Sequence, residues 1–569
     1  MAPSQFIDER TASSVGRGVR LARCIQWLLL LVMHLVLLYV VYQVHIHPDP
    51  RTSRQLSGQY QLVTRSAQDR GTIFDRSGEP LALSVPTMST FLDPGVEGYD
   101  PTTLQKILPL LGAKERAALE KGPLTKRFYW LKRYGTVEEA QELMQAGGKG
   151  VYSRLERKRV YPKGSILSHL LGFTDSDGIG LSGIELKWNN VLYVPERIAV
   201  NYRGTSSFLF RDEVERSDKQ GVYLTVDSQV QYAMERFLGP AAEKHNAEWA
   251  AAICLESNTG AVLGMASWPA FDPNDRSTFG DAQRLKNNAI NQVYEPGSTF
   301  KPLYVAMAMD RGIINGKSSF RCPAYLRVAD AVMKDSHPKD NGTLNVTQIL
   351  EKSSNVGMAQ IGLKTNAYEI YNDMRSLGFG SKTGITLGGE ETGLVNPPER
   401  WLGVVPANVA IGQGFACTPL QLATAFNAIV NNGVLLRPYL VRYAVDAHGD
   451  EVLTQKATEV NRVFSPATAR WVRTALRSVV ENGTAKVTNT PLVPVAAKTG
   501  TAQVAFKGQY VKGIYNASMI GFWPADKPEY TLLVVFGNVK GSTYYGGQVA
   551  GPVFRDIVEE ITRLRGKGE

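Results

Sequence analysis

The chain has 569 residues, of which 43% are hydrophobic and 20% are charged. This composition is typical of a globular protein and excludes a disordered one, and the length is sufficient for several domains. The net charge of +10 would fit a nucleic-acid partner, but no basic run or zinc-finger spacing accompanies it, so we expect no nucleic acid and favour attraction to an anionic lipid or polymer.

The first expected element is a membrane-spanning helix near the N-terminus. Residues 25 to 44 contain no Asp, Glu, Lys or Arg, and a run of about 20 such residues can cross a bilayer. The preceding tail is rich in arginine, so the positive-inside rule places residues 1–24 in the cytoplasm, 25–46 in the membrane and the remainder outside. Cleavage as a signal peptide is disfavoured because no small-residue cleavage site follows the run.

The exported part is expected to divide near residue 220. Residues 47–220 mix strand-like segments with a more helical insertion at roughly 102–145, and they form the first domain. The segment Tyr223–Asp227 is predicted to be the strand that leads into a second domain, residues 221–569.

Three cysteines, Cys254, Cys322 and Cys417, would lie in an oxidising compartment. Because three is an odd number, at least one of them should be free, and the sequence leaves their disulfide state open. Cys254 lies in an apolar stretch and is expected to be a core residue.

The most informative motif is Ser298-Thr299-Phe300-Lys301. A serine and a lysine three positions apart share one side of a helix, where a neutral lysine amine can take the serine proton without a histidine. The Pro296-Gly297 turn can present Ser298 at a helix start, and the apolar run after Pro302 predicts a helix that is buried on most sides. Taken alone, this short pattern is better explained by an N-capping serine with a solvated lysine.

Two further motifs follow in a fixed order. Ser353-Ser354-Asn355 lies between probable helices around Gln348 and Met358, and Lys498-Thr499-Gly500-Thr501 lies in an expected strand, residues 493–506. The order S-x-x-K, S-x-N and K-T-G is far more specific than any one of the three patterns.

Other segments match known patterns but are expected to be loops or turns. Ser336-x-x-Lys339 is interrupted by a proline in a polar stretch, and glycines surround Lys382-Thr383-Gly384. Gly312–Ser318 approaches a phosphate-binding loop but is one residue short between its glycines. The histidines are scattered and neither H-E-x-x-H nor C-x-x-C occurs, so we expect no metal site and no cofactor.

The order and spacing of the three motifs resemble those of the penicillin-recognising serine acyltransferases, and further segments resemble the class B penicillin-binding proteins. The segments that carry this resemblance are Arg70–Ala82, Arg159–Gly164, His169–Gly172, Gly180–Glu185, Gly412–Gly414, Thr418–Ala423, Tyr544–Gly547 and Gly551–Phe554. They span roughly residues 60 to 560, and the chain is identified as a member of this family of peptidoglycan D,D-transpeptidases. The resemblance implies an α+β fold with a single N-terminal transmembrane helix, an elongated pedestal (dimerisation-type) domain, and a transpeptidase domain with an antiparallel sheet flanked by helices.

The resemblance also implies the roles of the catalytic residues. Ser298 attacks the carbonyl of a D-Ala-D-Ala stem peptide, and Lys301 receives its proton, which requires a neutral amine. Ser353 relays the proton to the departing D-alanine, and Asn355 holds Lys301 and the substrate amide. Burial and the charge of Lys498 are both expected to lower the pKa of Lys301.

The third motif is implied to bind the substrate. Lys498, Thr499 and Thr501 would hold the terminal carboxylate, with Gly500 between the two threonines. The backbone N–H groups of Ser298 and Thr501 would form the oxyanion hole, which is typically worth a few kcal/mol per donor. A β-lactam would acylate the same serine and remain attached.

Two cellular roles compete within the family. The length and the stretch Tyr515–Glu529 resemble the septal, FtsI-type enzyme, whose usual partner is the SEDS glycan polymerase FtsW. Gln503-Val504 instead resembles the elongation enzymes, which pair with RodA, and Tyr193–Arg197 departs from the usual septal sequence. We expect a septal role, with the elongation role as the alternative.

Two other functions are alternatives to transpeptidation. A β-lactamase would need a deacylating water, and Glu185-Leu-Lys-Trp-Asn189 has E-x-x-x-N form, but it precedes the serine instead of following it. A membrane β-lactam sensor is the alternative of another class. The tail before Ile25 leaves no room for a cytoplasmic effector, and the pedestal segments have no role in a sensor.

Overall fold

The structure is a computed structural model of the chain, and it describes residues 25–42, 61–65, 69–121, 124–194, 198–202, 219–280, 282–506 and 509–566. The contacts between residues divide the chain into two compact units. The first unit comprises Met1–Ser66 with Glu196–Glu213, and the second comprises Ala67–Pro195 with Val214–Glu569.

The first unit contains the apolar helix that the sequence predicts. This helix runs over Ile25–Tyr42, has a mean hydropathy of 2.2 and exposes its side chains. Its 18 residues rise about 27 Å, so its length and composition allow it to cross a bilayer. Residues 43–46 of the expected span lie outside the described residues. The other described part of this unit is the antiparallel pair of β1 (Gln61–Arg65) and β8 (Ile198–Tyr202).

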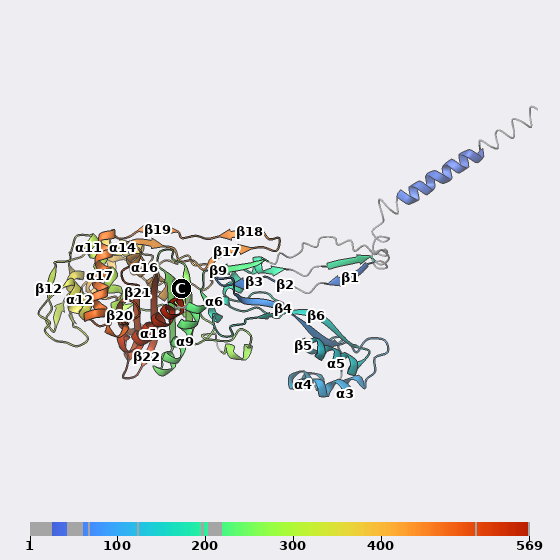
Figure 1. The fold of residues 1–569 in the computed structure, drawn as a ribbon, viewed down its shortest axis with the longest axis horizontal. Helices are drawn as coiled ribbons and strands as arrows, with labels where there is room; N and C mark the ends of the chain where they lie inside the picture. The colour runs from blue at the N-terminus through green and yellow to red at the C-terminus, as the bar shows by residue number, and fades with distance from the viewer. Residues whose placement is uncertain are drawn as a thin grey trace, which may run out of the picture. The chain divides into compact units, whose positions relative to one another are not determined.

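The second unit is built around a five-stranded antiparallel sheet with the order β11-β10-β22-β21-β20 (Figure 1). The strands are β10 (Trp249–Glu256), β11 (Val262–Trp268), β20 (Ala496–Phe506), β21 (Gln509–Trp523) and β22 (Tyr530–Lys540). Nearly every residue of β10 is buried, as expected of a continuous apolar run that is covered on both faces. The strand β20 forms one edge of the sheet, and β11 forms the other.

Helices cover both faces of this sheet, which confirms the expected α+β arrangement. Phe522 and Trp523 are consecutive on β21 and therefore point to opposite faces. Phe522 lies against Phe426 of α16, whereas Trp523 lies against Phe554 of α18. The helices that contact the sheet are α9 (Ser228–Lys244), α10 (Asn288–Asn291), α16 (Pro419–Val430), α17 (Pro466–Asn482) and α18 (Gly546–Gly566), and α11 (Lys301–Asp310) packs against α16 and α17.

A second sheet contains strands from both sides of residue 220. Its order is β18-β17-β9-β3-β4-β5, and β6 pairs with β4. The predicted strand at 223–227 is β9 (Gly221–Leu224), which lies parallel to β3 and antiparallel to β17. The other strands are β3 (Thr72–Phe74), β4 (Pro80–Leu92), β5 (Tyr129–Gly135), β6 (Val151–Val160), β17 (Val441–Val445) and β18 (Glu451–Thr454).

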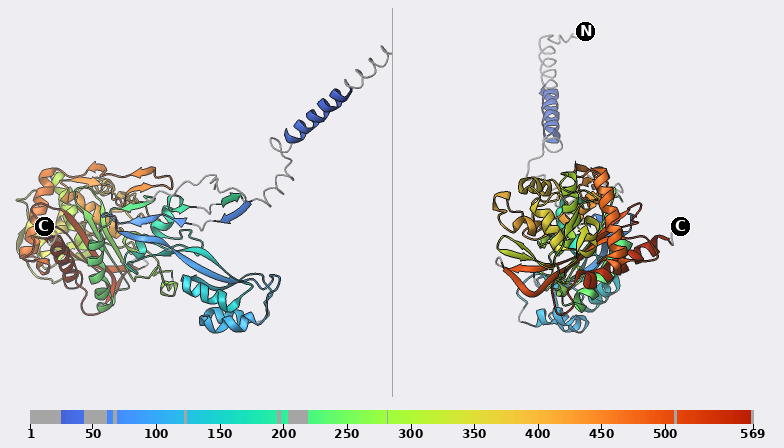
Figure 2. Two further views of the ribbon diagram at one scale, coloured as in Figure 1. Left: turned by 45° about the vertical axis from the view of Figure 1, so that its right-hand side comes forward. Right: turned by 90° about the vertical axis from the view of Figure 1, so that its left-hand side faces the viewer.

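The predicted helical insertion contains helices and one strand. It comprises α3 (Thr103–Ile107), η1 (Leu108–Leu110), α4 (Ala113–Glu120), β5 and α5 (Val137–Gly147). A capping box formed by Thr136 and Glu139 starts α5. These elements enclose a small core of their own, and they lie at the end of β4 and β6 that is farther from the five-stranded sheet (Figure 1, Figure 2).

A buried ionic network joins three of the family-like segments. Arg70 Nε donates to Glu185 Oε2 at 2.5 Å, and Arg159 Nε donates to Oε1 at 2.7 Å. Burial opposes the ionisation of Glu185, but the charges of Arg159 and Arg70 keep its pKa below the usual value. Arg70 Nη1 also donates to Asn189 Oδ1 at 2.8 Å. Glu185 and Asn189, the residues of the E-x-x-x-N pattern, are therefore both partners of a structural arginine.

Short elements complete the second unit. The remaining helices are α6 (Ser168–Leu171), α7 (Gly183–Lys187), α8 (Asn189–Leu192), η2 (Arg276–Phe279), η3 (Gly297–Phe300), α12 (Val346–Lys352), α13 (Asn355–Leu363), α14 (Ala367–Ser376), η4 (Pro398–Arg400), α15 (Val405–Ala410) and η5 (Lys486–Thr488). The remaining strand pairs are β2 (Asp69–Arg70) with β7 (Tyr193–Val194), β12 (Ser319–Arg321) with β15 (Thr343–Asn345), β13 (Leu326–Val328) with β14 (Ala331–Met333), and β16 (Val434–Leu436) with β19 (Glu459–Arg462).

Cys254, Cys322 and Cys417 are free and buried. Cys254 lies in β10 and is a core residue, as predicted.

Candidate active site

Ser298 lies in η3, a single 3₁₀ turn that leads directly into α11. The preceding Gly297 has a φ of +56°, which favours glycine, and its N–H donates to Gly412 O at 2.9 Å. A Cβ on Gly412 would lie 2.0 Å from Gly297 O. The family-like segment Gly412–Gly414 therefore supports the turn that presents the serine.

Lys301 is the first residue of α11, and Pro302 lies in the first turn as predicted. The following residues 303–308 are buried, so this helix is enclosed on all sides. The Lys301 side chain is fully buried with them. Its amine therefore has to find polar partners inside the protein.

Ser353 and Asn355 occupy a corner between two helices. Ser353 ends α12 in a left-handed conformation with a φ of +55°. Ser354 caps α13 by accepting from Gly357 N–H, and Asn355 is the first helical residue. The predicted helices around Gln348 and Met358 are confirmed, and the sharp turn directs both Ser353 and Asn355 toward Lys301.

The third motif lies on the edge strand β20, which begins at Ala496 rather than at 493. A Cβ on Gly500 would lie 2.4 Å from Ser518 Oγ and 2.8 Å from Thr299 Cγ2. Only a glycine at this position lets η3 pack across the strand. This packing brings the turn that carries Ser298 next to the strand that carries Lys498.

Two lysine amines converge on Ser353. Lys301 Nζ lies 2.7 Å from Ser353 O, 2.8 Å from Asn355 Oδ1 and 3.3 Å from Ser353 Oγ. Lys498 Nζ donates to Ser353 Oγ at 2.9 Å. Because a hydroxyl can donate and accept at once, Ser353 can connect the two amines by hydrogen bonds.

Burial favours the neutral form of both amines. It lowers the pKa of Lys301 to about 7, although the charge of Asp335 acts in the opposite direction. Burial also lowers the pKa of Lys498 well below its ordinary value, and the charge of Lys301 adds to this effect. At neutral pH a large fraction of Lys301 is therefore a free base, as proton abstraction from a serine requires.

The Ser298 hydroxyl makes no hydrogen bond within the described part of the chain. Catalytic hydrogen bonds are often long or absent in a free enzyme and tighten when substrate binds. The half-buried Ser298 is thus placed by its turn and by the start of α11.

The threonines of the third motif contact two other segments. Thr499 Oγ1 lies 3.0 Å from Thr484 Oγ1. Thr501 Oγ1 accepts from Gly546 N–H at 2.9 Å, so the family-like segment Tyr544–Gly547 packs against β20. The Tyr544 ring stacks on Tyr515 with ring centroids 4.0 Å apart, which places an aromatic pair beside this motif.

Asp335 is a site residue that the sequence reasoning missed. Its Oδ1 accepts from the backbone N–H of Asn355 at 2.6 Å and of Val356 at 3.1 Å, and Ser354 Oγ donates to it at 3.1 Å. No local pattern could have revealed this residue, because it lies 20 positions before Asn355. Asn355 Nδ2 also donates to Lys334 O at 3.0 Å.

The second S-x-x-K pattern is a loop, as predicted, but it lies beside the site. Ser336-x-x-Lys339 follows Asp335 directly, and the His337 ring is 5.8 Å from the Tyr545 ring. The second K-T-G pattern, Lys382–Gly384, also lacks helix and strand. Among the described residues, no group of three or more His, Cys, Asp or Glu side chains is placed to hold a metal ion.

Comparisons with known proteins agree with this geometry. Residues 250–559 match the family model described as the penicillin-binding protein transpeptidase domain, and residues 65–194 match the penicillin-binding protein dimerisation domain. The chain is 33% identical over 502 residues to the probable peptidoglycan D,D-transpeptidase PenA of Neisseria gonorrhoeae, covering 86% of this chain and 83% of the relative. It is 31% identical over 516 residues to the peptidoglycan D,D-transpeptidase FtsI of Escherichia coli, covering 88% and 84%.

A solved structure shows the same fold. Penicillin-binding protein 3 from Mycobacterium tuberculosis, complexed with aztreonam, superimposes with a TM-score of 0.68 at 25% identity. The match covers 88% of this chain and 97% of that chain.

Proposed function

Because the chain belongs to the class B penicillin-binding proteins and is a peptidoglycan D,D-transpeptidase, we propose that its acyl transfer proceeds through Ser298 with Lys301 as the base. The buried Lys301 amine carries this proposal. It lies within 2.7–3.3 Å of oxygens of Ser353 and Asn355, and its pKa of about 7 makes it a base at neutral pH.

Acylation then follows from these contacts. Ser298 Oγ forms a bond to the carbonyl carbon of the penultimate D-alanine, and its proton passes to Lys301 Nζ. Ser353 Oγ delivers its proton to the nitrogen of the terminal D-alanine and takes a proton from Lys301 Nζ, which lies 3.3 Å away, so that the C–N bond breaks, D-alanine leaves and Lys301 is neutral again. An amine from a neighbouring stem peptide attacks the acyl-enzyme, gives up its proton along the same path and releases Ser298.

The remaining motif residues hold the substrate. Lys498, Thr499 and Thr501 bind its terminal carboxylate. Gly500 has no side chain and so lets the turn that carries Ser298 lie close to β20. The N–H groups of Ser298 and Thr501 stabilise the developing oxyanion.

Replacing the nucleophile tests this proposal. Ser298→Ala should abolish covalent labelling of the full-length protein by a fluorescent penicillin. The matched control is Ser336→Ala in the second S-x-x-K pattern, which should label like the wild type. Persistent labelling of Ser298→Ala, or loss of labelling in the control only, would contradict the assignment.

We propose that the enzyme is a β-lactam target that releases the drug slowly. The structural neighbour from Mycobacterium tuberculosis was solved in complex with aztreonam. In this proposal Ser298 attacks the carbonyl of a β-lactam as it attacks the carbonyl of the stem peptide. Release of bound penicillin over many hours would support this. Turnover within seconds would favour the β-lactamase alternative, although Glu185 and Asn189 are occupied by Arg70.

We propose a septal role in cell division. The similarity to FtsI and the stretch Tyr515–Glu529 support it, and the proposed partner is a SEDS glycan polymerase, FtsW. The second candidate is the elongation role with RodA as the partner, because Gln503-Val504 resembles the elongation enzymes. A functional fluorescent fusion should concentrate at midcell, whereas a signal along the side wall would favour elongation.

We propose that the chain is a single-pass protein of the inner membrane with residues 1–24 in the cytoplasm, 25–46 in the membrane, a pedestal at 47–220 and a transpeptidase domain at 221–569. The apolar helix Ile25–Tyr42 supports the anchor. Protease added outside spheroplasts should digest the catalytic domain and spare an N-terminal tag. Protection of the catalytic domain from the added protease would show the opposite orientation.

A further inference from the structure

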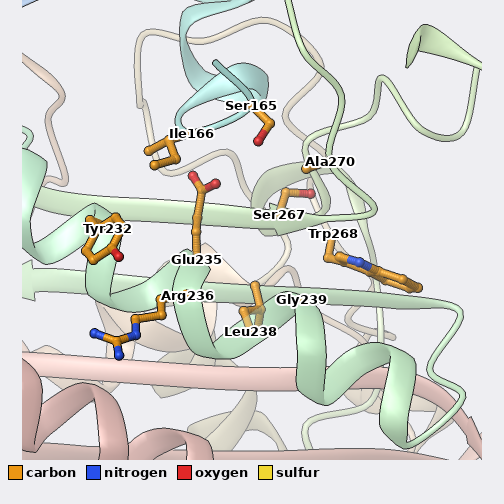
Figure 3. A pocket seen from close by; sticks show the side chains of 10 residues that line it. All are labelled: Ser165, Ile166, Tyr232, Glu235, Arg236, Leu238, Gly239, Ser267, Trp268 and Ala270. Carbon is orange, nitrogen blue, oxygen red and sulfur yellow. The ribbon is translucent and has the colours of Figure 1, made fainter. Parts of the chain in front are cut away.

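A cavity of about 300 Å³ lies between the pedestal loop at Ser165–Ile166 and the helix α9 (Figure 3). Ser267 and Trp268, at the end of β11, also line this cavity. The strand β11 is the edge of the five-stranded sheet opposite to β20, which carries Lys498. This cavity is therefore separate from the transpeptidase site.

The carboxyl of Glu235 is the distinctive group of this cavity. Its Oε1 accepts from Leu167 N–H at 2.8 Å and from Gln231 Nε2 at 2.6 Å. Among the described residues, its Oε2 accepts no hydrogen bond and no cationic side chain pairs with it. Figure 3 shows the carboxyl reaching from α9 toward Ser165 and Ile166. One oxygen of a partly buried acid is thus left for a group that enters the cavity.

The neighbouring Arg236 does not neutralise this acid. Its Nη1 donates to Glu560 Oε1 at 3.1 Å, and its guanidinium lies over the Phe237 ring. Figure 3 shows the Arg236 guanidinium pointing away from the Glu235 carboxyl. Tyr232 is the other titratable side chain in the lining.

The environment of Glu235 disfavours an isolated negative charge. Burial raises the pKa of Glu235 to about 7, since a carboxylate removed from water without a counter-charge is costly. A cation brought to the carboxylate would offset this cost.

The other walls suit a carbon chain. Ile166, Leu238 and Trp268 supply apolar surface, and Ser165 adds a hydroxyl. The Ser267 hydroxyl is already bonded to Lys286 O and to Asn288 N–H. A metal ion would need several oxygen ligands, and among the described residues no suitable acidic cluster surrounds Glu235. An organic cation with an apolar body fits both the single carboxylate and the apolar walls.

We propose that this cavity binds a small organic amine or guanidine, with the cationic group at Glu235 and the carbon chain along Leu238 and Trp268. The ligand would contact the pedestal loop at Ser165–Ile166 and the helix α9 together. Its binding would therefore stabilise the junction between the pedestal and the transpeptidase domain.

Direct binding to the full-length protein in non-ionic detergent tests this proposal, with n-pentylamine as the probe and n-pentanol as its neutral counterpart. Calorimetry should detect n-pentylamine binding and at least tenfold weaker n-pentanol binding. Glu235→Gln keeps an acceptor for Leu167 N–H but removes the charge, and it should weaken n-pentylamine binding at least tenfold. The control Glu243→Gln makes the same charge change at an exposed position of α9 and should bind within twofold of the wild type.

A second variant fills the space instead of changing the charge. A Cβ on Gly239 would lie 3.4 Å from Trp268 Cδ1, so Gly239→Leu should occupy the cavity and abolish n-pentylamine binding with Glu235 intact. Penicillin labelling of Ser298 reports the folding of each variant, and it is measured independently of amine binding. The proposal is overturned if the wild type does not bind n-pentylamine at millimolar concentration, if Glu235→Gln binds like the wild type, or if n-pentanol binds equally well.

Discussion

Asp335 Oδ1 lies 2.6 Å from the backbone nitrogen of Asn355, whose own side-chain oxygen lies 2.8 Å from Lys301 Nζ. A carboxylate at the first turn of α13 is also favoured by the helix dipole. Asp335 therefore holds Asn355, and Asn355 in turn contacts Lys301, the proposed base. It is a positioning residue, and it acts on Lys301 both through Asn355 and through its charge.

Asp335→Asn should slow β-lactam acylation by about 10- to 100-fold, because losing a charge-assisted hydrogen bond costs about 1.5–3 kcal/mol. The charge of Asp335 raises the pKa of Lys301, so its removal should also shift the midpoint of the pH–rate profile below the wild-type value. Stopped-flow acylation between pH 5 and 9 measures both effects.

The control for this variant is Asp330→Asn, an exposed acid in the neighbouring turn. It makes the same charge change without contacting α13 and should acylate like the wild type. A slower rate with an unchanged midpoint would show that Asp335 acts by holding Asn355 and not through its charge on Lys301.

The sequence predicted the parts of the site that depend on local patterns. The turn before Ser298, the buried helix after Lys301 and the strand at Lys498 all follow from the spacing of glycine, proline and apolar residues. The role of Asp335 could not be predicted in this way, because its partner Asn355 is distant in sequence and the contact depends on tertiary packing. The strand β5 inside the predicted helical insertion was missed for a similar reason, since its pairing with β4 decides its conformation.

Acylation should depend on pH through Lys301. Its pKa is lowered to about 7, so the active neutral amine is lost as pH falls through about 7 and gained as pH rises. The acylation rate should therefore increase about tenfold from pH 6 to pH 8 and then level off. Rates measured with a fluorescent penicillin check this, and a profile that rises only above pH 9 would mean that burial does not lower the pKa of the base to about 7.

Gly500→Ala should reduce acylation by at least tenfold. The added methyl group would meet Ser518 Oγ at 2.4 Å and Thr299 Cγ2 at 2.8 Å, so η3 has to move away from β20 and takes Ser298 with it. The loss should appear in the acylation rate with little change in circular dichroism. Gly388→Ala is the control, since a Cβ there meets nothing within 4 Å; equal rates in the two variants would show that the contact between η3 and β20 is unimportant.

Glu185→Gln should destabilise the protein far from Ser298. The carboxylate is fully buried and neutralises Arg70 and Arg159, and breaking a buried ion pair on one side costs about 3–5 kcal/mol. Because the pKa of folded Glu185 is lowered, its stabilising effect is complete above the unfolded pKa and is lost as pH falls through the folded one. The variant should therefore be less stable than the wild type at neutral pH, and the free energies of unfolding of the two proteins should become equal only at strongly acidic pH.

Urea unfolding of the full-length protein in detergent measures this loss, and penicillin labelling per folded molecule should remain unchanged. The matched control is Glu481→Gln, which breaks the exposed pair with Arg477 at 2.8 Å and should cost about 0.5 kcal/mol or less. Equal losses in the two variants would mean that the buried network adds no more than a surface ion pair. Because Glu185 holds the segments at Arg70 and Arg159 together, we expect the buried network to contribute more than the exposed pair.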